Sequence, residues 1–111
     1  MQLYFYFLED GVLTLDSCEV VEKPKTYRPV KRKPKCFYGQ FIRKDDIGKI
    51  TGYSLKTLIL SERDDRKACG LFSKWVKTQI EINKDNILHI EKKNKELRET
   101  MEMLEDSERN L

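Results

Sequence analysis

The residues of this sequence best suited to binding chemistry are the lysines and arginines of residues 23–35 (KPKTYRPVKRKPK), where seven of thirteen positions are basic. Aromatic residues lie within this segment and just after it. A guanidinium group can hold a phosphate through two hydrogen bonds, and aromatic rings can stack on nucleotide bases. We therefore predict a ligand-binding site for an anionic nucleotide, formed by Tyr27, Arg28, Lys31, Arg32, Lys33, Phe37 and Arg43. The alternative is a solvated loop whose charge serves solubility.

Residues for catalysis are scarce. His89 is the single histidine, so neither a catalytic triad nor a His-rich metal site can be assembled. The cysteines Cys18, Cys36 and Cys69 share no C-x-x-C spacing, and no glycine-rich phosphate-binding motif occurs. The sequence therefore predicts a protein that is not an enzyme and that has no cofactor and no metal.

The net charge of +3 conceals a strong segregation along the chain. Residues 1–22 carry five acidic residues and no basic one, whereas residues 23–49 carry ten basic residues against Asp45 and Asp46. A basic segment of this density indicates an anionic partner. No stretch approaches the roughly 20 apolar residues of a membrane-spanning helix, so no membrane contact is expected. The odd number of cysteines favours the reducing cytoplasm.

Elements that would position these residues can be read from the hydrophobic pattern. Residues 2–8 and 12–22 predict a hairpin around Asp10-Gly11, with the first strand covered on both faces. The three prolines make residues 23–35 an exposed extended loop or edge segment rather than a central strand. Residues 36–43 predict a third strand, and residues 49–60 one bent strand or two short ones divided near Gly52. Residues 1–60 thus predict a small antiparallel β-sheet or barrel of four or five strands.

A long helix is predicted from Ser61 to the end of the chain, giving an α+β protein. Ser61 and Asp64 match a capping box at its start. Residues 61–79 carry a broad apolar face, expected to pack on the sheet, that comprises Ala68, Leu71, Phe72, Trp75 and Val76. Asn83 to Asn86 is the weakest helical stretch, and a break there would fold the tail back. We favour a continuous helix.

Beyond residue 79 the apolar face narrows to a heptad seam over residues 80–106, which predicts a homo-oligomer. The oligomerisation residues are Ile80, Ile87, Ile90, Asn94, Leu97, Met101 and Leu104. Asn94 occupies an a position, where a polar residue sets register. Ile87 at a with Ile90 at d favours a coiled coil of three or more helices. A parallel dimer would bring Lys93 of one helix against Arg98 of the other. The alternative is a helix that packs only on its own sheet.

The layout resembles small orphan accessory proteins encoded by phages and prophages of Firmicutes. The carrying features are LYFYF (Leu3 to Phe7), the acidic hairpin turn, VEKPKTYR (Val21 to Arg28), IRKDDIGK (Ile42 to Lys49) and the charged terminal helix. The resemblance implies an anti-defence role in the cytoplasm of a host bacterium. Some such proteins are anti-CRISPR inhibitors, and others, such as anti-Thoeris sponges, trap cyclic nucleotide signals between subunits.

The leading hypothesis is a non-enzymatic oligomer that sequesters a phosphorylated, cyclic nucleotide immune signal in pockets between subunits. One alternative is an anti-CRISPR inhibitor that binds a Cas effector protein or its guide RNA. The other is a nucleic-acid-binding phage accessory protein, whose affinity would fall steeply with rising salt.

Overall fold

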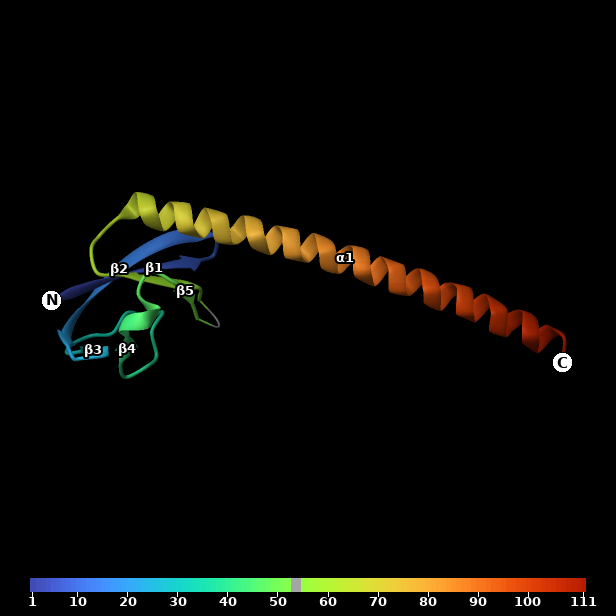
Figure 1. The fold of residues 1–111 in the computed structure, drawn as a ribbon, viewed down its shortest axis with the longest axis horizontal. Coiled ribbons are helices and arrows are strands. Elements are labelled where there is room, and N and C mark those ends of the chain that lie inside the picture. The colour runs from blue at the N-terminus through green and yellow to red at the C-terminus, as the bar shows by residue number, and fades with distance from the viewer. Residues whose placement is uncertain (53–54) are drawn as a thin grey trace. The chain divides into compact units, whose positions relative to one another are not determined.

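A computed structural model describes residues 1–52 and 55–111 of the chain. Its strands are β1 (Gln2–Glu9), β2 (Val12–Glu22), β3 (Thr26–Pro29), β4 (Ile42–Arg43), β5 (Ile50–Thr51) and β6 (Thr57–Leu60). They form one antiparallel sheet in the order β4-β3-β2-β1-β6-β5, curled into a half-barrel (Figure 1). A 3₁₀ turn, η1 (Lys44–Asp46), follows β4, and the helix α1 (Asp65–Arg109) follows the sheet. The predicted α+β class is confirmed, with six strands where four or five were expected.

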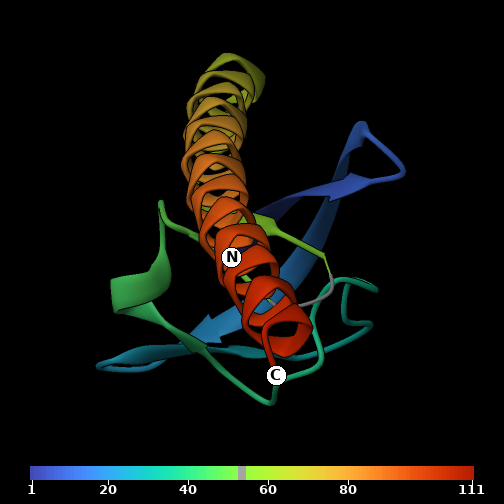
Figure 2. The ribbon, with the colours of Figure 1, turned by 90° about the vertical axis from the view of Figure 1, so that its right-hand side faces the viewer.

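The chain forms two compact units, residues 1–73 and 74–111, so the first turns of α1 belong to the unit that contains the sheet. Helix α1 is nonetheless uninterrupted over 45 residues, and Figure 2 shows its ribbon unbroken from end to end. The continuous helix through Asn83 to Asn86 is therefore confirmed. No helix in the described ranges carries an apolar stretch that could cross a bilayer.

The predicted hairpin is confirmed, and it places β1 at the centre of the sheet. Asp10 and Gly11 have positive φ values of 52° and 76°, the geometry that a two-residue hairpin turn requires. β1 is covered on both faces, because alternate side chains enter two different clusters. The first cluster comprises Leu3, Phe5, Cys18, Val20, Tyr27, Ile42 and Ile59. The second comprises Tyr6, Leu58, Leu60, Ala68 and Phe72, so the first turns of α1 close the core.

Two strand predictions between residues 23 and 43 are wrong. A third strand was expected over residues 36–43, but only Ile42–Arg43 pair in the sheet. Residues before them turn instead, because Pro34 is buried and the Phe37 N–H donates to the Pro34 carbonyl at 3.0 Å. Within the predicted loop, Thr26–Pro29 form β3, which lies between β2 and β4 rather than at an edge.

The segment 49–60 forms two short strands, β5 and β6, with residues 53–54 of that prediction outside the described residues. β6 pairs with β1, and β5 forms the far edge of the sheet. Of the two predicted arrangements, one bent strand or two short strands, the chain therefore adopts the second.

The predicted start of the helix at Ser61 is also wrong. Helix α1 begins at Asp65, and the Asp64 carboxylate accepts a hydrogen bond from the Lys67 N–H at 3.0 Å. β6 runs to Leu60, so the chain must first turn away from the sheet before a helix can start. Asp64 is therefore the N-cap, one residue before the helix, where a short acidic side chain is most effective.

Candidate functional site

Several basic residues between residues 31 and 44 form ion pairs with the acidic hairpin of the same chain. Arg32 pairs with Asp16 at 2.9 Å and Lys31 with Glu19 at 3.2 Å. Two further pairs, Lys35 to Glu9 at 2.6 Å and Lys44 to Glu22 at 3.1 Å, follow the same pattern. The acidic and basic residues that are separated along the sequence thus lie next to one another in the fold. Lys31 and Arg32, both predicted ligand residues, already hold carboxylates.

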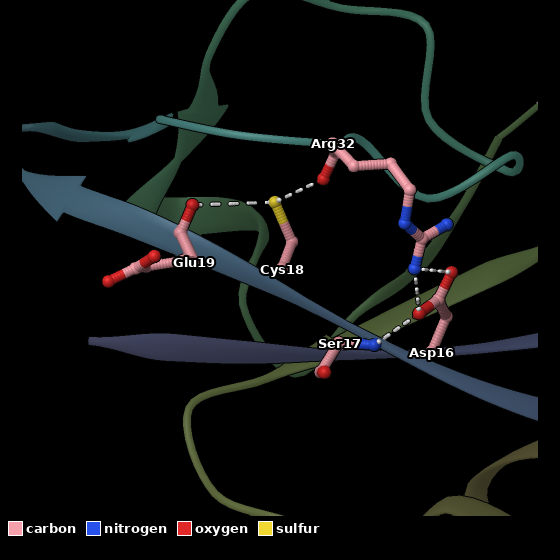
Figure 3. Close-up of polar contacts among 5 residues, drawn as sticks. All are labelled: Asp16, Ser17, Cys18, Glu19 and Arg32. Carbon is pink, nitrogen blue, oxygen red and sulfur yellow. Dashed lines mark hydrogen bonds and ion pairs between the residues drawn. The ribbon is translucent and has the colours of Figure 1, made fainter.

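The loop that carries Arg32 also contacts β2 at Cys18, as Figure 3 shows. The sulfur of Cys18 lies 3.5 Å from the carbonyl oxygen of Glu19 and 3.6 Å from that of Arg32. Burial raises the pKa of the Cys18 thiol, and the neighbouring Asp16 carboxylate raises it further. Cys18 is therefore held as a neutral thiol and not as a reactive thiolate.

The two aromatic residues predicted for base stacking belong to the core. Tyr27 is only 8% exposed, and the Lys44 ammonium lies 5.3 Å from the centre of its ring. Phe37 is half-buried against the first cluster, with its ring centroid 5.9 Å from that of Phe5. Tyr27 therefore presents no open face on which a base could stack, and the Phe37 ring is partly covered by the core.

The residues next to two buried side chains of β3 and β4 do face outward. Tyr27 and Ile42 are paired in register and point into the core, so their neighbours point the other way. These neighbours are Thr26, Arg28, Phe41 and Arg43, and we call them, with Tyr38, Lys23 and Lys25, the Phe41 surface. Phe41 is 56% exposed and Tyr38 is 82% exposed, so both offer apolar faces to solvent.

Three hollows meet at Phe41, which lines all of them. The first, of about 290 Å³, is also lined by Cys36, Phe37, Tyr38, Ile42, Arg43, Asp46, Thr51, Gly52, Leu55, Thr57 and Ile59. The second, of about 300 Å³, adds Lys23, Thr26, Arg28 and Gln40. The third, of about 750 Å³, adds Pro24, Lys25, Thr26, Arg43, Lys44 and Asp45. Phe41 thus shares these hollows with several lysines and arginines.

The cations of the Phe41 surface differ from Lys31 and Arg32 in their ion pairing. Within the described part of the chain, Lys23, Lys25, Arg28 and Arg43 form no ion pair. Lys33, the remaining predicted ligand residue, is exposed beyond this surface and lines none of its hollows. The arrangement can hold an anion beside a stacked ring, with Asp45 and Asp46 as the neighbouring carboxylates.

Phe41 is the residue that the sequence interpretation missed. The signal was available in the triplet Phe41-Ile42-Arg43, since a buried Ile42 in a strand sends both neighbours outward. Among residues 1–52 and 55–111, no group of three or more histidine, cysteine or acidic side chains is arranged to hold a metal ion.

The seam residues form a second candidate surface, on the unit of residues 74–111. Their apolar members, Ile80, Ile87, Ile90, Leu97, Met101 and Leu104, are between 48% and 66% exposed. Asn94 is exposed among them. Burying such a stripe is the main driving force for helix association in water.

Comparison with models of protein families, with characterised proteins and with solved structures finds no significant match to this chain. The two candidate surfaces therefore rest on their own geometry.

Proposed function

We propose that the protein is a non-enzymatic, homo-oligomeric binding protein that sequesters a phosphorylated nucleotide on the Phe41 surface. The observation that carries this proposal is the position of Phe41, an exposed ring shared by three hollows whose walls include Arg28 and Arg43. A guanidinium beside an exposed ring suits a ligand with both a phosphate and a base. The exposed seam of α1 supports assembly into an oligomer.

The resemblance to phage accessory proteins makes a cyclic nucleotide of host immunity the expected ligand. Sequestration needs only binding, and the Phe41 surface supplies charge and stacking for that purpose. Lys31 and Arg32 contribute through their ion pairs to the shape of the loop and not to the ligand.

The test is isothermal titration of the full chain with cyclic mononucleotides, cyclic dinucleotides and ADP-ribose compounds, with inorganic phosphate as the charge-only probe. We expect Arg43→Ala to weaken nucleotide binding by roughly tenfold or more, since charge-assisted hydrogen bonds contribute about 1.5–3 kcal/mol. Phe41→Ala should weaken nucleotide binding and leave phosphate binding unchanged. The matched control is Arg66→Ala, an exposed arginine of α1 that lines none of the three hollows.

Failure of every nucleotide to bind would overturn the proposal. Binding of a single-stranded oligonucleotide alone, collapsing as salt rises, would assign the Phe41 surface to nucleic acid instead. A stoichiometric complex with a Cas effector, formed without any nucleotide binding, would make the protein an inhibitor of that effector.

A further inference from the structure

The flanks of the seam carry a charge pattern that distinguishes the possible arrangements of two helices. With Ile87 at position a, the e positions are Lys84, Glu91, Arg98 and Glu105, so the sign alternates at every heptad. The g positions are Asn86, Lys93, Thr100 and Ser107, which include a single charge. Charges at e and g are the ones that set partner choice and orientation in coiled coils.

We infer that α1 pairs with α1 of a second copy in antiparallel orientation, in the register that sets Asn94 against the partner's Leu97. This two-helix arrangement replaces the three or more helices that Ile87 and Ile90 favour in a parallel coiled coil. This inference rests on the homo-oligomer of the proposed function and specifies its geometry. In a parallel pair, g residues of one helix face e residues of the other, and Lys93 would meet the partner's Arg98. That contact is repulsive, and no parallel g–e contact joins opposite charges.

Reversal of one helix brings e against e and g against g. In the inferred register Glu91 faces the partner's Arg98, and Lys84 faces the partner's Glu105. Each contact occurs twice by two-fold symmetry, and all of them join opposite charges. At the g flank, Lys93 faces the partner's Thr100, which is uncharged.

Neighbouring antiparallel registers fail the same charge criterion. A slip by one heptad in one direction sets Glu91 against the partner's Glu91 and Lys84 against the partner's Arg98. A slip in the other direction sets Arg98 against the partner's Arg98 and Glu91 against the partner's Glu105. Like charges thus meet on both sides of the inferred register, which favours it over either register displaced by one heptad.

In this register, apolar layers lie on either side of the two layers that contain Asn94. Ile87 packs against the partner's Leu104, and Ile90 packs against the partner's Met101. A hollow of about 270 Å³ between Asn94, Leu97, Arg98 and Met101 lies on the seam of each helix. The partner's Asn94 would enter this hollow beside the Arg98 side chain, so its polar amide would lie next to a polar group.

The charged residues of this flank are available for such contacts. Glu91, Arg98 and Glu105 form no ion pair within the described chain, and Lys84 lies 3.5 Å from Glu81 of the same helix. All four are exposed. A second copy can therefore supply Glu91, Arg98 and Glu105 with ion-pair partners that they lack in the described part of the chain.

Charge reversal at one residue separates the two orientations. Arg98→Glu in the antiparallel pair replaces two attractive contacts by Glu–Glu contacts, and we expect it to raise the dissociation constant roughly 5- to 30-fold at low salt. In a parallel pair the same change would set the new glutamate against the partner's Lys93 and tighten association. The double variant Glu91→Arg, Arg98→Glu restores opposite charges in the antiparallel pair and should recover the original dissociation constant.

The measurement is sedimentation equilibrium of the full chain at low and high salt. The matched control is Lys92→Glu, which makes the same charge change at position f, outside the seam in either orientation. Tighter or unchanged association of Arg98→Glu would overturn the antiparallel register while leaving the oligomer in place. A monomeric wild-type chain would instead refute the oligomer of the proposed function.

Discussion

The hydroxyl group of Tyr6 donates a 2.6 Å hydrogen bond to the carboxylate of Asp65, which joins the middle of β1 to the first residue of α1. The same hydroxyl oxygen accepts a hydrogen bond from the Asp64 N–H at 3.0 Å. Tyr6 is 2% exposed, and its ring lies in the second core cluster with Ala68 and Phe72. One side chain therefore sets where the helix begins and holds its first turn to the sheet.

Tyr6→Phe should lower the free energy of unfolding by about 1 kcal/mol or somewhat more, because the Asp65 carboxylate and the Asp64 N–H both lose the hydroxyl as a hydrogen-bond partner. Chemical denaturation followed by circular dichroism measures the change. The control is Tyr4→Phe on the same strand, since the Tyr4 hydroxyl forms no hydrogen bond to another described side chain. Equal losses in the two variants would contradict the role given to Tyr6.

The Tyr6–Asp65 contact also predicts a dependence on pH. The hydrogen bond from Tyr6 lowers the pKa of Asp65, and the Arg63 guanidinium lowers it further. Because the pKa is lower in the folded state, the ionised carboxylate stabilises the fold above its unfolded pKa of about 4, and this contribution is lost as the pH falls through the folded pKa. The stability difference between wild type and Tyr6→Phe should therefore narrow in acid. A difference that stays constant from neutral pH to below pH ~3 would contradict this prediction.

Two phenylalanines of opposite exposure provide a matched pair. Phe72 is 3% exposed in the second core cluster, so Phe72→Ala should cost about 3–5 kcal/mol of unfolding free energy. Phe41→Ala removes the same atoms from an exposed position and should cost less than about 0.5 kcal/mol. Denaturant midpoints check both values. A large loss for Phe41→Ala would place that ring in the core and remove it from the binding surface.

The pairing of the basic loop with β2 predicts that removing acids will strengthen binding to polyanions. The double variant Asp16→Asn, Glu19→Gln releases Arg32 and Lys31 from their ion pairs. We expect the slope of log K against log salt for a single-stranded oligonucleotide to steepen by roughly 1–2 units. The control is Asp85→Asn, Glu96→Gln, which makes the same change in net charge on α1. Equal steepening in both would show that net charge, and not release of these cations, is responsible.

Because the seam residues are exposed, substitutions in the seam should affect oligomer formation without unfolding the unit of residues 1–73. Replacing Ile87 and Ile90, both 55% exposed, with aspartate should abolish the oligomer and leave the unit of residues 1–73 folded. Size-exclusion chromatography with light scattering reports the first effect, and near-ultraviolet circular dichroism reports the second. The control is Leu88→Asp, Met103→Asp, two exposed apolar residues off the a and d positions. Unfolding of the whole chain by the seam variant would place the seam in the core of the sheet unit.

Local patterns in the sequence were enough for the hairpin and for the helix through Asn83 to Asn86. Both depend on neighbours in sequence: a turn pair with positive φ, and apolar residues at helical spacing. The start of the helix was misplaced by the same local reasoning. Ser61 and Asp64 both suit an N-cap, and the choice of Asp64 follows from where β6 ends and from the contact with Tyr6.

Local sequence patterns define three parts of the protein: a strand buried on both faces, a dense basic segment, and a long helix with a heptad seam. The tertiary structure alone decided which cations stay free. Arg32 and Arg43 both lie in the basic stretch of residues 23–49 and were both predicted to bind the ligand. In the fold, Arg32 pairs with Asp16, whereas Arg43 lies beside Phe41 and forms no ion pair in the described chain. Ion pairing and burial join residues far apart along the chain, and a pattern of period two or seven carries no information about such distant contacts.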